Sequence, residues 1–463
     1  MATTALNGSS PPVPGSRTLR RLGIPPLPVE LTDPDSGRAL ALAWIATRAF
    51  VVTFLVWIEG VVAGDVAYYA RSLQSMFDGG GVRETLQEYP LPVLGILVPQ
   101  FAAGWLNPTA FALVFVGSML AVDAALTRLF WVASRRTRGP AVTFWLWFLP
   151  AIGPMAYFRF DLLPAAFAAG VVLTAVRRPA IAGMFTAFGA ALKLWPAIML
   201  PILLVRRAGQ RQVLTSFLAT GAAIAAICLL IGGVGRSISP LSWQDARGLQ
   251  IESVPAVPLM LLRGVHPHGI WQVHPSKYKS AEIFGPAVST VLTLTTVATI
   301  AALIFLGILV VRARTMKEVS AQTMGWLLLA AAMLITVTNK TLSPQYLVWL
   351  GGPLAALLIF RRAAHESGGV AQQAARWLMA AAVITHVIYP VKYSKLMNIS
   401  EQTFWVTLLL AARNIILLYI TWLVCKEAWS HTSHSNEAQQ ASEAELAAET
   451  ADAASAPAAR TSE

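Results

Sequence analysis

Charged residues are scarce in this chain of 463 residues, of which only 13% are Asp, Glu, Lys or Arg. Soluble proteins carry charge on about a quarter of their residues, so this scarcity excludes an ordinary soluble multidomain protein. Hydrophobic residues make up 56% of the sequence, and apolar runs recur along its whole length. The composition therefore predicts an all-α polytopic membrane protein embedded in a lipid bilayer.

Cysteine is nearly absent. The two cysteines, Cys228 and Cys425, lie far apart in the sequence, each in or beside an apolar run. This spacing excludes a disulfide framework. The N-terminal segment is rich in Pro and Ser and lacks the short apolar stretch and cleavage site of a signal peptide, so we expect it to stay in the cytoplasm.

The net charge of +12 does not indicate a nucleic-acid partner, because the basic residues form small clusters beside the apolar runs. This placement follows the positive-inside rule, under which cytoplasmic loops carry the Lys and Arg residues. The charge is therefore a topology signal. The clusters are Arg17/Arg20/Arg21, Arg135/Arg136/Arg138, Arg177/Arg178, Arg206/Arg207/Arg211, Arg312/Arg314/Lys317 and Arg361/Arg362.

With these clusters inside, the apolar runs predict twelve spans and place both termini in the cytoplasm. The transmembrane domain covers 39–426, and the tails at 1–38 and 427–463 are predicted to be disordered. The segment 91–105 is apolar but short, contains two prolines and has no basic flank, so we interpret it as re-entrant or interfacial. The predicted spans are 40–62, 107–132, 141–158, 162–176, 180–192, 194–205, 213–232, 286–311, 322–338, 346–360, 376–390 and 403–425.

Lys193 lies near the middle of the apolar stretch 180–205, which has an arginine pair at each end. A lysine at membrane mid-depth costs roughly 2.5–3.5 kcal/mol on insertion scales, so packing alone does not explain it. Basic pairs at both ends predict that both ends face the cytoplasm. We therefore expect a hairpin of two short helices, with Lys193 at an apex that can hold an anionic head group.

The few carboxylates outside the tails gather in segments predicted to be exterior. A transporter is expected to place such groups inside its helices at mid-depth, yet the predicted spans carry almost no charge apart from Arg48, Asp123 and Lys193. This distribution favours chemistry at the outer surface, and Asp123 is expected to be structural. The exterior carboxylates are Asp65, Asp78, Glu84, Glu88, Asp161, Asp245 and Glu252.

The first exterior segment predicts a short amphipathic helix directly after Asp65. Val66, Tyr69, Leu73 and Met76 recur at helical spacing, and we expect this apolar stripe to lie in the membrane interface. Asp65 is then the N-cap of this helix, a reactive carboxylate held rigidly at its start, or both.

Four short blocks resemble one family and follow its order along the chain. They are GDVAYY with a Gly-rich break and YPLP after it, RFDLLPAAFAAGVVL, AIAGMFTAFGAALKLWPAIMLPILL, and NKTLSPQYLVWL. In these blocks the chain resembles the polyprenol-phosphate-mannose-dependent mannosyltransferases of actinobacterial envelopes, which are integral-membrane glycosyltransferases with the C-type fold. Leu91 departs from that family, which often has a second proline there.

The resemblance implies mannose transfer from a polyprenyl-phosphate donor to a hydroxyl of a glycolipid or lipoglycan, on the outer face of the cytoplasmic membrane. Asp65 corresponds to the family's first-loop catalytic carboxylate, the general base of a single inverting displacement. No metal or other cofactor is required, because phosphate is a good leaving group and needs only positive charge to hold it. The exterior cations expected to bind this phosphate are Lys193, Lys340, Arg159 and Arg247.

The long exterior loop 233–285 contains residues suited to sugar recognition. Trp243 can stack on a sugar ring, and Gln250 can bond to hydroxyls. Three nearby histidines raise the possibility of a metal site, but their irregular spacing favours substrate hydrogen bonds or a plain loop. All the residues expected to contact substrate are Tyr69, Glu88, Tyr89, Asp161, Trp243, Gln250, His266, His268 and Gln345.

Some alternatives stay open at this point. Arg159 is also placed to pair with Asp161 two residues on, and Lys340 to act as an interfacial anchor. The same architecture suits another lipid-linked sugar, such as arabinofuranose. A flippase of polyprenyl-linked intermediates is the alternative from a different functional class.

Overall fold

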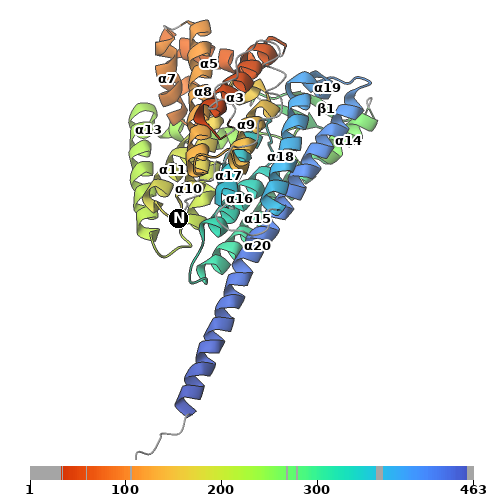
Figure 1. The fold of residues 1–463 in the computed structure, drawn as a ribbon. Coiled ribbons are helices and arrows are strands. Elements are labelled where there is room, and N and C mark those ends of the chain that lie inside the picture. The colour runs from red at the N-terminus through yellow and green to blue at the C-terminus, as the bar shows by residue number, and fades with distance from the viewer. Residues whose placement is uncertain are drawn as a thin grey trace, which may run out of the picture.

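The computed structural model describes residues 33, 35–58, 60–104, 107–266, 269–277, 280–360 and 369–455, so residues 1–32 of the predicted tail at 1–38 lie outside this part. Helices dominate the described chain (Figure 1). The first half contains α3 (Gly37–Ala49), α4 (Val56–Ile58), α5 (Gly64–Ser75), α6 (Gly81–Glu84), α7 (Pro92–Ala103), α8 (Pro108–Ala133), α9 (Pro140–Ile152), α10 (Leu162–Thr174), α11 (Pro179–Leu192), α12 (Leu200–Leu203) and α13 (Gln210–Ala246). The second half contains α14 (Val257–Val265), β1 (Gln272–Pro275), β2 (Ala281–Phe284), α15 (Val288–Arg314), α16 (Ala321–Val337), α17 (Tyr346–Phe360), α18 (Gly369–His386), α19 (Tyr393–Met397) and α20 (Thr403–Ser455).

Within the described ranges, six helical segments are long and apolar enough to cross a membrane, which confirms the prediction of a polytopic α-helical membrane protein. Shorter apolar helices of 10–17 residues accompany them. The long segments are Gly37–Leu55, Pro108–Ala133, Gln210–Ala246, Val288–Arg314, Gly369–Val391 and Thr403–Ser433.

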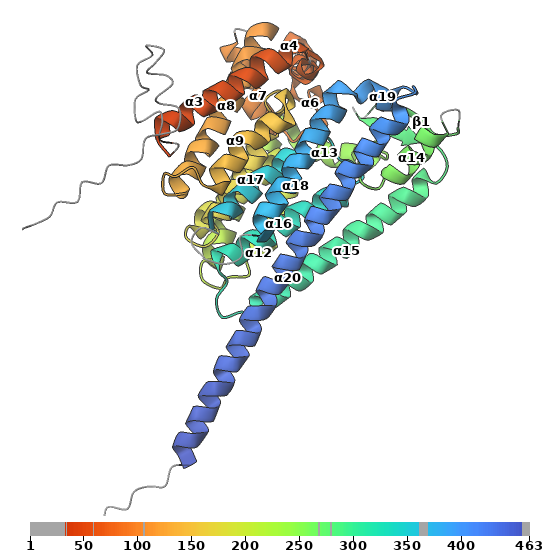
Figure 2. The ribbon, with the colours of Figure 1, turned by 45° about the vertical axis from the view of Figure 1, so that its right-hand side comes forward.

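The short apolar helices form the centre of the bundle. α17 is buried along almost its whole length and packs against α9, α10, α16 and α18. Gly351 permits this close packing, because a Cβ there would lie 2.0 Å from the ring of Phe148. The outer helices α13 and α15 are exposed instead (Figures 1 and 2), and Leu230 on α13 is 86% exposed. Such apolar outer faces suit contact with lipid.

The predicted hairpin around Lys193 is present. α11 ends at Leu192, and the chain returns along it through a short 3₁₀ turn, Trp195–Met199, and then α12. The return is irregular because Pro196 and Pro201 cannot donate the backbone hydrogen bonds of a continuous helix.

One further boundary follows the sequence, and another does not. α13 breaks at Gly233, whose φ of 72° ends the span where the long exterior loop was expected to begin. The segment 91–105 forms the 12-residue helix α7, which packs on α8. The segment from 427, which was predicted to be disordered, is helical as far as Ser455, because α20 continues through it. Ala and Glu, which are frequent there, have high helix propensity.

The segments predicted to be exterior gather at one end of the bundle, at the top of Figures 1 and 2. This end contains α5, α6, α14, α19 and an antiparallel ribbon of β1 and β2, with Gln272 opposite Phe284. The ribbon was not expected from the sequence. It closes one side of the site described next.

Candidate functional site

Asp65 lies in the first turn of α5 but does not cap it. The preceding 3₁₀ turn, Gly60–Ala63, runs directly into the helix, so Ala63 takes the cap position without a side-chain bond. The N-cap prediction for Asp65 is therefore wrong. Its carboxylate forms an ion pair with the guanidinium of Arg159 instead.

The apolar stripe of α5 faces the protein and not the membrane interface, which corrects a second prediction. Val66, Tyr69 and Leu73 are buried. Tyr69 packs against Phe115 of α8, with ring centroids 5.8 Å apart, and its hydroxyl lies 3.5 Å from that of Tyr89. Tyr69 is therefore a buried packing residue next to Tyr89.

Lys193 and Asp161 form a second ion pair. The Lys193 Nζ lies 3.4 Å from Asp161 Oδ1, and the indole Nε1 of Trp349 donates to the same oxygen at 2.9 Å. The Lys193 ammonium also lies 5.0 Å from the ring centroid of Phe160. Arg159 and Asp161 were the expected alternative pair, but each forms its ion pair with a residue from another segment. Arg159 pairs with Asp65, and Asp161 pairs with Lys193.

Asp65, Arg159 and Lys193 line a cavity of about 210 Å³, which we call the central cavity, whereas Asp161 does not line it. Carboxylates, cations and amides from five separate segments of the chain line it together. It brings together most of the site residues predicted from the sequence. Its lining is Asp65, Tyr68, Glu88, Tyr89, Arg159, Lys193, Arg247, Gln250, Glu252, Ser280, Ala281, Thr341, Ser343, Pro344, Gln345, Tyr346, Tyr389 and Tyr393.

Four buried polar atoms of this lining have no hydrogen-bond partner within the described part of the chain. Two are donors, the Nε atoms of Arg159 and Arg247, and two are acceptors, Oε1 of Glu252 and Oε1 of Gln345. Buried polar groups are almost always paired, so a molecule in this cavity that both donates and accepts hydrogen bonds would satisfy these atoms. A sugar phosphate does so.

Glu252 was not predicted as a site residue. It is fully buried, and Arg413 of α20 contacts its Oε2 at 3.3 Å and donates to its backbone oxygen at 2.6 Å. Asn414 donates to the same backbone oxygen. Burial raises the pKa of Glu252 to about 7, and the nearby Arg413 charge opposes this shift. The sequence does carry one signal for this buried contact, the adjacent polar residues Arg413 and Asn414 within the apolar span 403–425. That signal was overlooked.

A second cavity of about 350 Å³, the apolar branch, adjoins the central cavity. The two share Glu88, Tyr89, Lys193, Arg247 and Tyr346. Away from this shared wall the lining becomes largely apolar, with Leu194, Trp195, Ile198, Ile335 and Trp349. An anionic head beside the two cations and a hydrocarbon chain along the branch would match this gradient.

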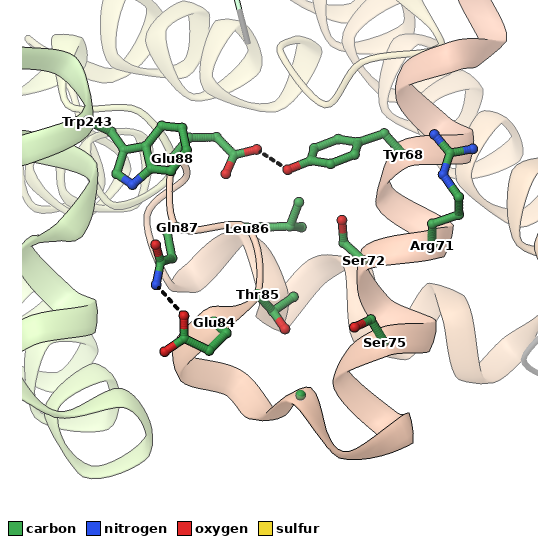
Figure 3. Close-up of a pocket in the computed structure, with 11 residues that line it drawn as sticks. Tyr68, Arg71, Ser72, Ser75, Glu84, Thr85, Leu86, Gln87, Glu88 and Trp243 are labelled. Carbon is green, nitrogen blue, oxygen red and sulfur yellow. Dashed lines mark hydrogen bonds between the residues drawn. The ribbon is translucent and has the colours of Figure 1, made fainter. Parts of the chain in front are cut away.

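A third cavity of about 350 Å³, the loop cavity, adjoins the central cavity, and Figure 3 shows the residues that line it. Tyr68 and Glu88 line both cavities, and the Tyr68 hydroxyl donates to Glu88 Oε1 at 2.6 Å. Burial, reinforced by this hydrogen bond, raises the pKa of Tyr68, so its hydroxyl stays protonated and acts as the donor. Trp243, predicted to stack on sugar, lies here.

Several predicted residues lie apart from the central cavity. The Lys340 ammonium donates to the backbone oxygen of Asp245 at 2.8 Å. His266 is exposed at the end of α14, His274 stacks on Phe284, and His268 lies outside the described residues. Within the described ranges, no group of three or more His, Cys, Asp or Glu side chains is placed to hold a metal ion.

Asp123 is structural, as expected. It is fully buried and accepts hydrogen bonds from Arg48, Trp44, Trp145 and Tyr157 at 2.7–3.0 Å. This cluster joins α3, α8 and α9.

Comparison with protein-family models gives no match for this chain, and comparison with curated protein sequences gives none either.

Proposed function

We propose that this chain is an integral-membrane glycosyltransferase that moves a sugar from a polyprenyl-phosphate donor to a hydroxyl of a cell-envelope glycolipid or lipoglycan. One arrangement carries the proposal: Asp65 shares the central cavity with Arg159, Lys193 and Arg247, and this cavity adjoins the apolar branch. Mannose as the sugar, the twelve-span C-type fold and a site on the outer face of the cytoplasmic membrane follow from the resemblance and the positive-inside pattern.

The donor fits across the two cavities. Its phosphate would lie between Lys193 and Arg247 on the shared wall, where two fixed cations stabilise the charge that develops as the phosphate leaves. Its polyprenyl chain would follow the indole and aliphatic side chains of the apolar branch. The unmet acceptors Glu252 Oε1 and Gln345 Oε1 would bind hydroxyls of the transferred sugar.

Asp65 would act as the general base. It takes the proton of the acceptor hydroxyl, whose oxygen attacks the anomeric carbon while the bond from that carbon to the phosphate oxygen breaks and its electron pair goes to the phosphate. One displacement inverts the anomeric centre. Arg159 holds the Asp65 carboxylate in place through their ion pair. No step in this scheme needs a protein acid, because the phosphate leaves as an anion.

The test is transfer of labelled mannose from polyprenyl-phosphate mannose in membranes that carry wild type or Asp65→Asn. We expect the variant to lose at least about two orders of magnitude in transfer rate, because asparagine keeps the shape but cannot accept the proton. Asp78→Asn is the matched control, since Asp78 lies in the same loop, contacts Gln74 and does not line the central cavity. It should retain activity.

Two outcomes would contradict the proposal. Full activity in Asp65→Asn would show that Asp65 is not the general base. A wild type that transfers neither mannose nor arabinose, but moves the lipid across proteoliposome membranes, would favour the flippase. Transfer of arabinose alone would keep the chemistry and change the donor sugar.

A further inference from the structure

We propose that a groove between α9 and α18 binds an anionic phospholipid, at the end of the bundle away from the central cavity. This inference does not depend on the proposed function. The groove is a cavity of about 600 Å³, which we call the α9–α18 groove. The residues that carry the argument are Arg138, Phe144, Trp147, Leu358, Arg376 and Met379.

The α9–α18 groove lies at the opposite ends of helices that also reach the central cavity. α9, α17 and α18 pack against one another (Figures 1 and 2). α17 begins at Tyr346, which lines the central cavity, whereas Leu358 of the groove is near its other end. Arg376 is in the first half of α18, and the chain reaches Tyr389 of the central cavity only after this helix has ended.

Both arginines of the groove are at the predicted membrane boundary. Arg138 shortly precedes the predicted span 141–158, and Arg376 is the first residue of the predicted span 376–390. This is also the side of the bundle on which the basic clusters predict the cytoplasm. Anionic lipids are concentrated in the cytoplasmic leaflet, and basic pockets between helices on that side suit their head groups.

Arg138 and Arg376 supply two positive charges that no protein group neutralises. Within the described ranges, neither guanidinium has a hydrogen-bond or ion-pair partner, and no acidic side chain lines the groove. Asp35 contacts Arg138 only through the backbone N–H of Arg138. Arginine binds phosphate oxygens through pairs of parallel hydrogen bonds, so two unpaired guanidinium groups beside one cavity suit a phosphodiester.

The rest of the groove is mainly apolar and lies deeper along the same two helices. Trp147, 52% exposed, and Phe144 follow Arg138 along α9, and Met379 follows Arg376 by about one turn of α18. Leu358, which is buried, adds an apolar wall from α17.

The groove therefore changes from cationic to apolar in the direction in which a phospholipid changes from head group to acyl chain. A soluble anion would leave the apolar wall without a partner, and a zwitterionic lipid would bring its own cation next to the two arginines. An anionic phospholipid matches both parts of the groove.

The test is lipid binding to the purified protein in detergent, measured by native mass spectrometry with phosphatidylglycerol and phosphatidylcholine. Each arginine at such a site contributes roughly fivefold in affinity, so we expect phosphatidylglycerol to bind roughly 25-fold more tightly than phosphatidylcholine. Arg138→Gln combined with Arg376→Gln should abolish this preference. Arg207→Gln is the matched control, because Arg207 is exposed in the basic cluster before α13 and lines none of the four cavities.

A second variant tests the apolar part and does not alter either arginine. Thr143 is exposed on α9 and lines the groove, so Thr143→Trp should fill the space of the acyl chain and weaken the binding of phosphatidylglycerol. Glycerol 1-phosphate, which carries the phosphate without the chains, should not compete at equal concentration. The melting temperature of each variant without added lipid checks that it is folded, and Thr143→Trp keeps the test decisive if the double arginine variant is not.

Three results would overturn the inference. Equal affinity for the two lipids would show that the groove does not select charge, and wild-type affinity in the double arginine variant would place the lipid elsewhere. Competition by glycerol 1-phosphate, together with no effect of Thr143→Trp, would indicate a site for soluble anions. Because the assay measures binding and not transfer, a failure of the transferase proposal would leave these results unchanged.

Discussion

The buried ion pair between Glu252 and Arg413 permits a sharp prediction. Both side chains are fully buried, and Arg413 makes the contact with the Glu252 carboxylate from α20. Replacing Arg413 by Met keeps the volume of the side chain but leaves a buried carboxylate without its cation. Breaking a buried pair in this way costs about 3–5 kcal/mol, so Arg413→Met should be strongly destabilised at pH 8.

Protonation of Glu252 should relieve that cost. Burial raises the pKa of Glu252 in the folded protein to about 7 from an ordinary value of 4.5, so the folded state holds this proton more tightly than the unfolded state. The stability contribution of the wild-type residue is therefore complete below about pH 4.5 and is lost as pH rises through about 7, a decline of ~3 kcal/mol. In Arg413→Met the decline should extend to higher pH and be larger in total, because no cation opposes the upward shift of the Glu252 pKa.

The assay is thermal unfolding of purified protein in detergent between pH 5 and pH 8. Glu252→Gln should flatten the pH dependence, and the double variant Glu252→Gln with Arg413→Met should recover much of the stability that Arg413→Met loses. The reasoning is refuted if Arg413→Met unfolds at the wild-type temperature at pH 8. It is equally refuted if neither acid nor Glu252→Gln relieves the defect.

Two further predictions concern the supports of the site. Arg236→Lys should loosen the segment 85–89, because one ammonium cannot replace a guanidinium that reaches three backbone oxygens. We expect the local stability of this segment to fall by about 2–4 kcal/mol, which hydrogen exchange would detect as faster exchange of its amides. Unchanged exchange would contradict this role of Arg236. Asp123→Asn should destabilise the whole protein by about 3–5 kcal/mol, since the buried Arg48 guanidinium would lose its counter-charge. A melting temperature within about one degree of wild type would show that the cluster is dispensable.

Much of the helical framework could be predicted from local patterns. Apolar runs predicted the long spans, the break at Gly233 was expected from the end of an apolar run, and the turn at Lys193 from arginine pairs at both ends of an interrupted stretch. These features depend on residues that are close together in the sequence. The length of an apolar run, and the effects of proline and glycine on the backbone, are both local properties. The same patterns missed the continuation of α20, where helix-forming Ala and Glu residues occur in a polar, low-complexity segment.

Several candidate site residues were also identified from sequence. Asp65, Arg159, Lys193, Arg247 and Gln345 all line the central cavity. The reason is topological: once the basic clusters orient the spans, polar residues at the opposite ends of the helices must share one side of the bundle. Sharing a side does not determine which residues come into contact, however. Lys340 bonds to a backbone oxygen, and Tyr69 is buried and does not line the central cavity.

The amino-acid sequence by itself determined the membrane class, the main helices and the side of the bundle on which polar groups collect. Only the tertiary structure decided which charges meet. Asp65 pairs with Arg159 and Lys193 with Asp161, while Glu252 pairs with Arg413 at a separation of 161 residues. The physical reason is that a pair forms only when helix packing, rotation and depth bring two side chains within about 4 Å, and these quantities depend on the whole bundle and not on any one segment.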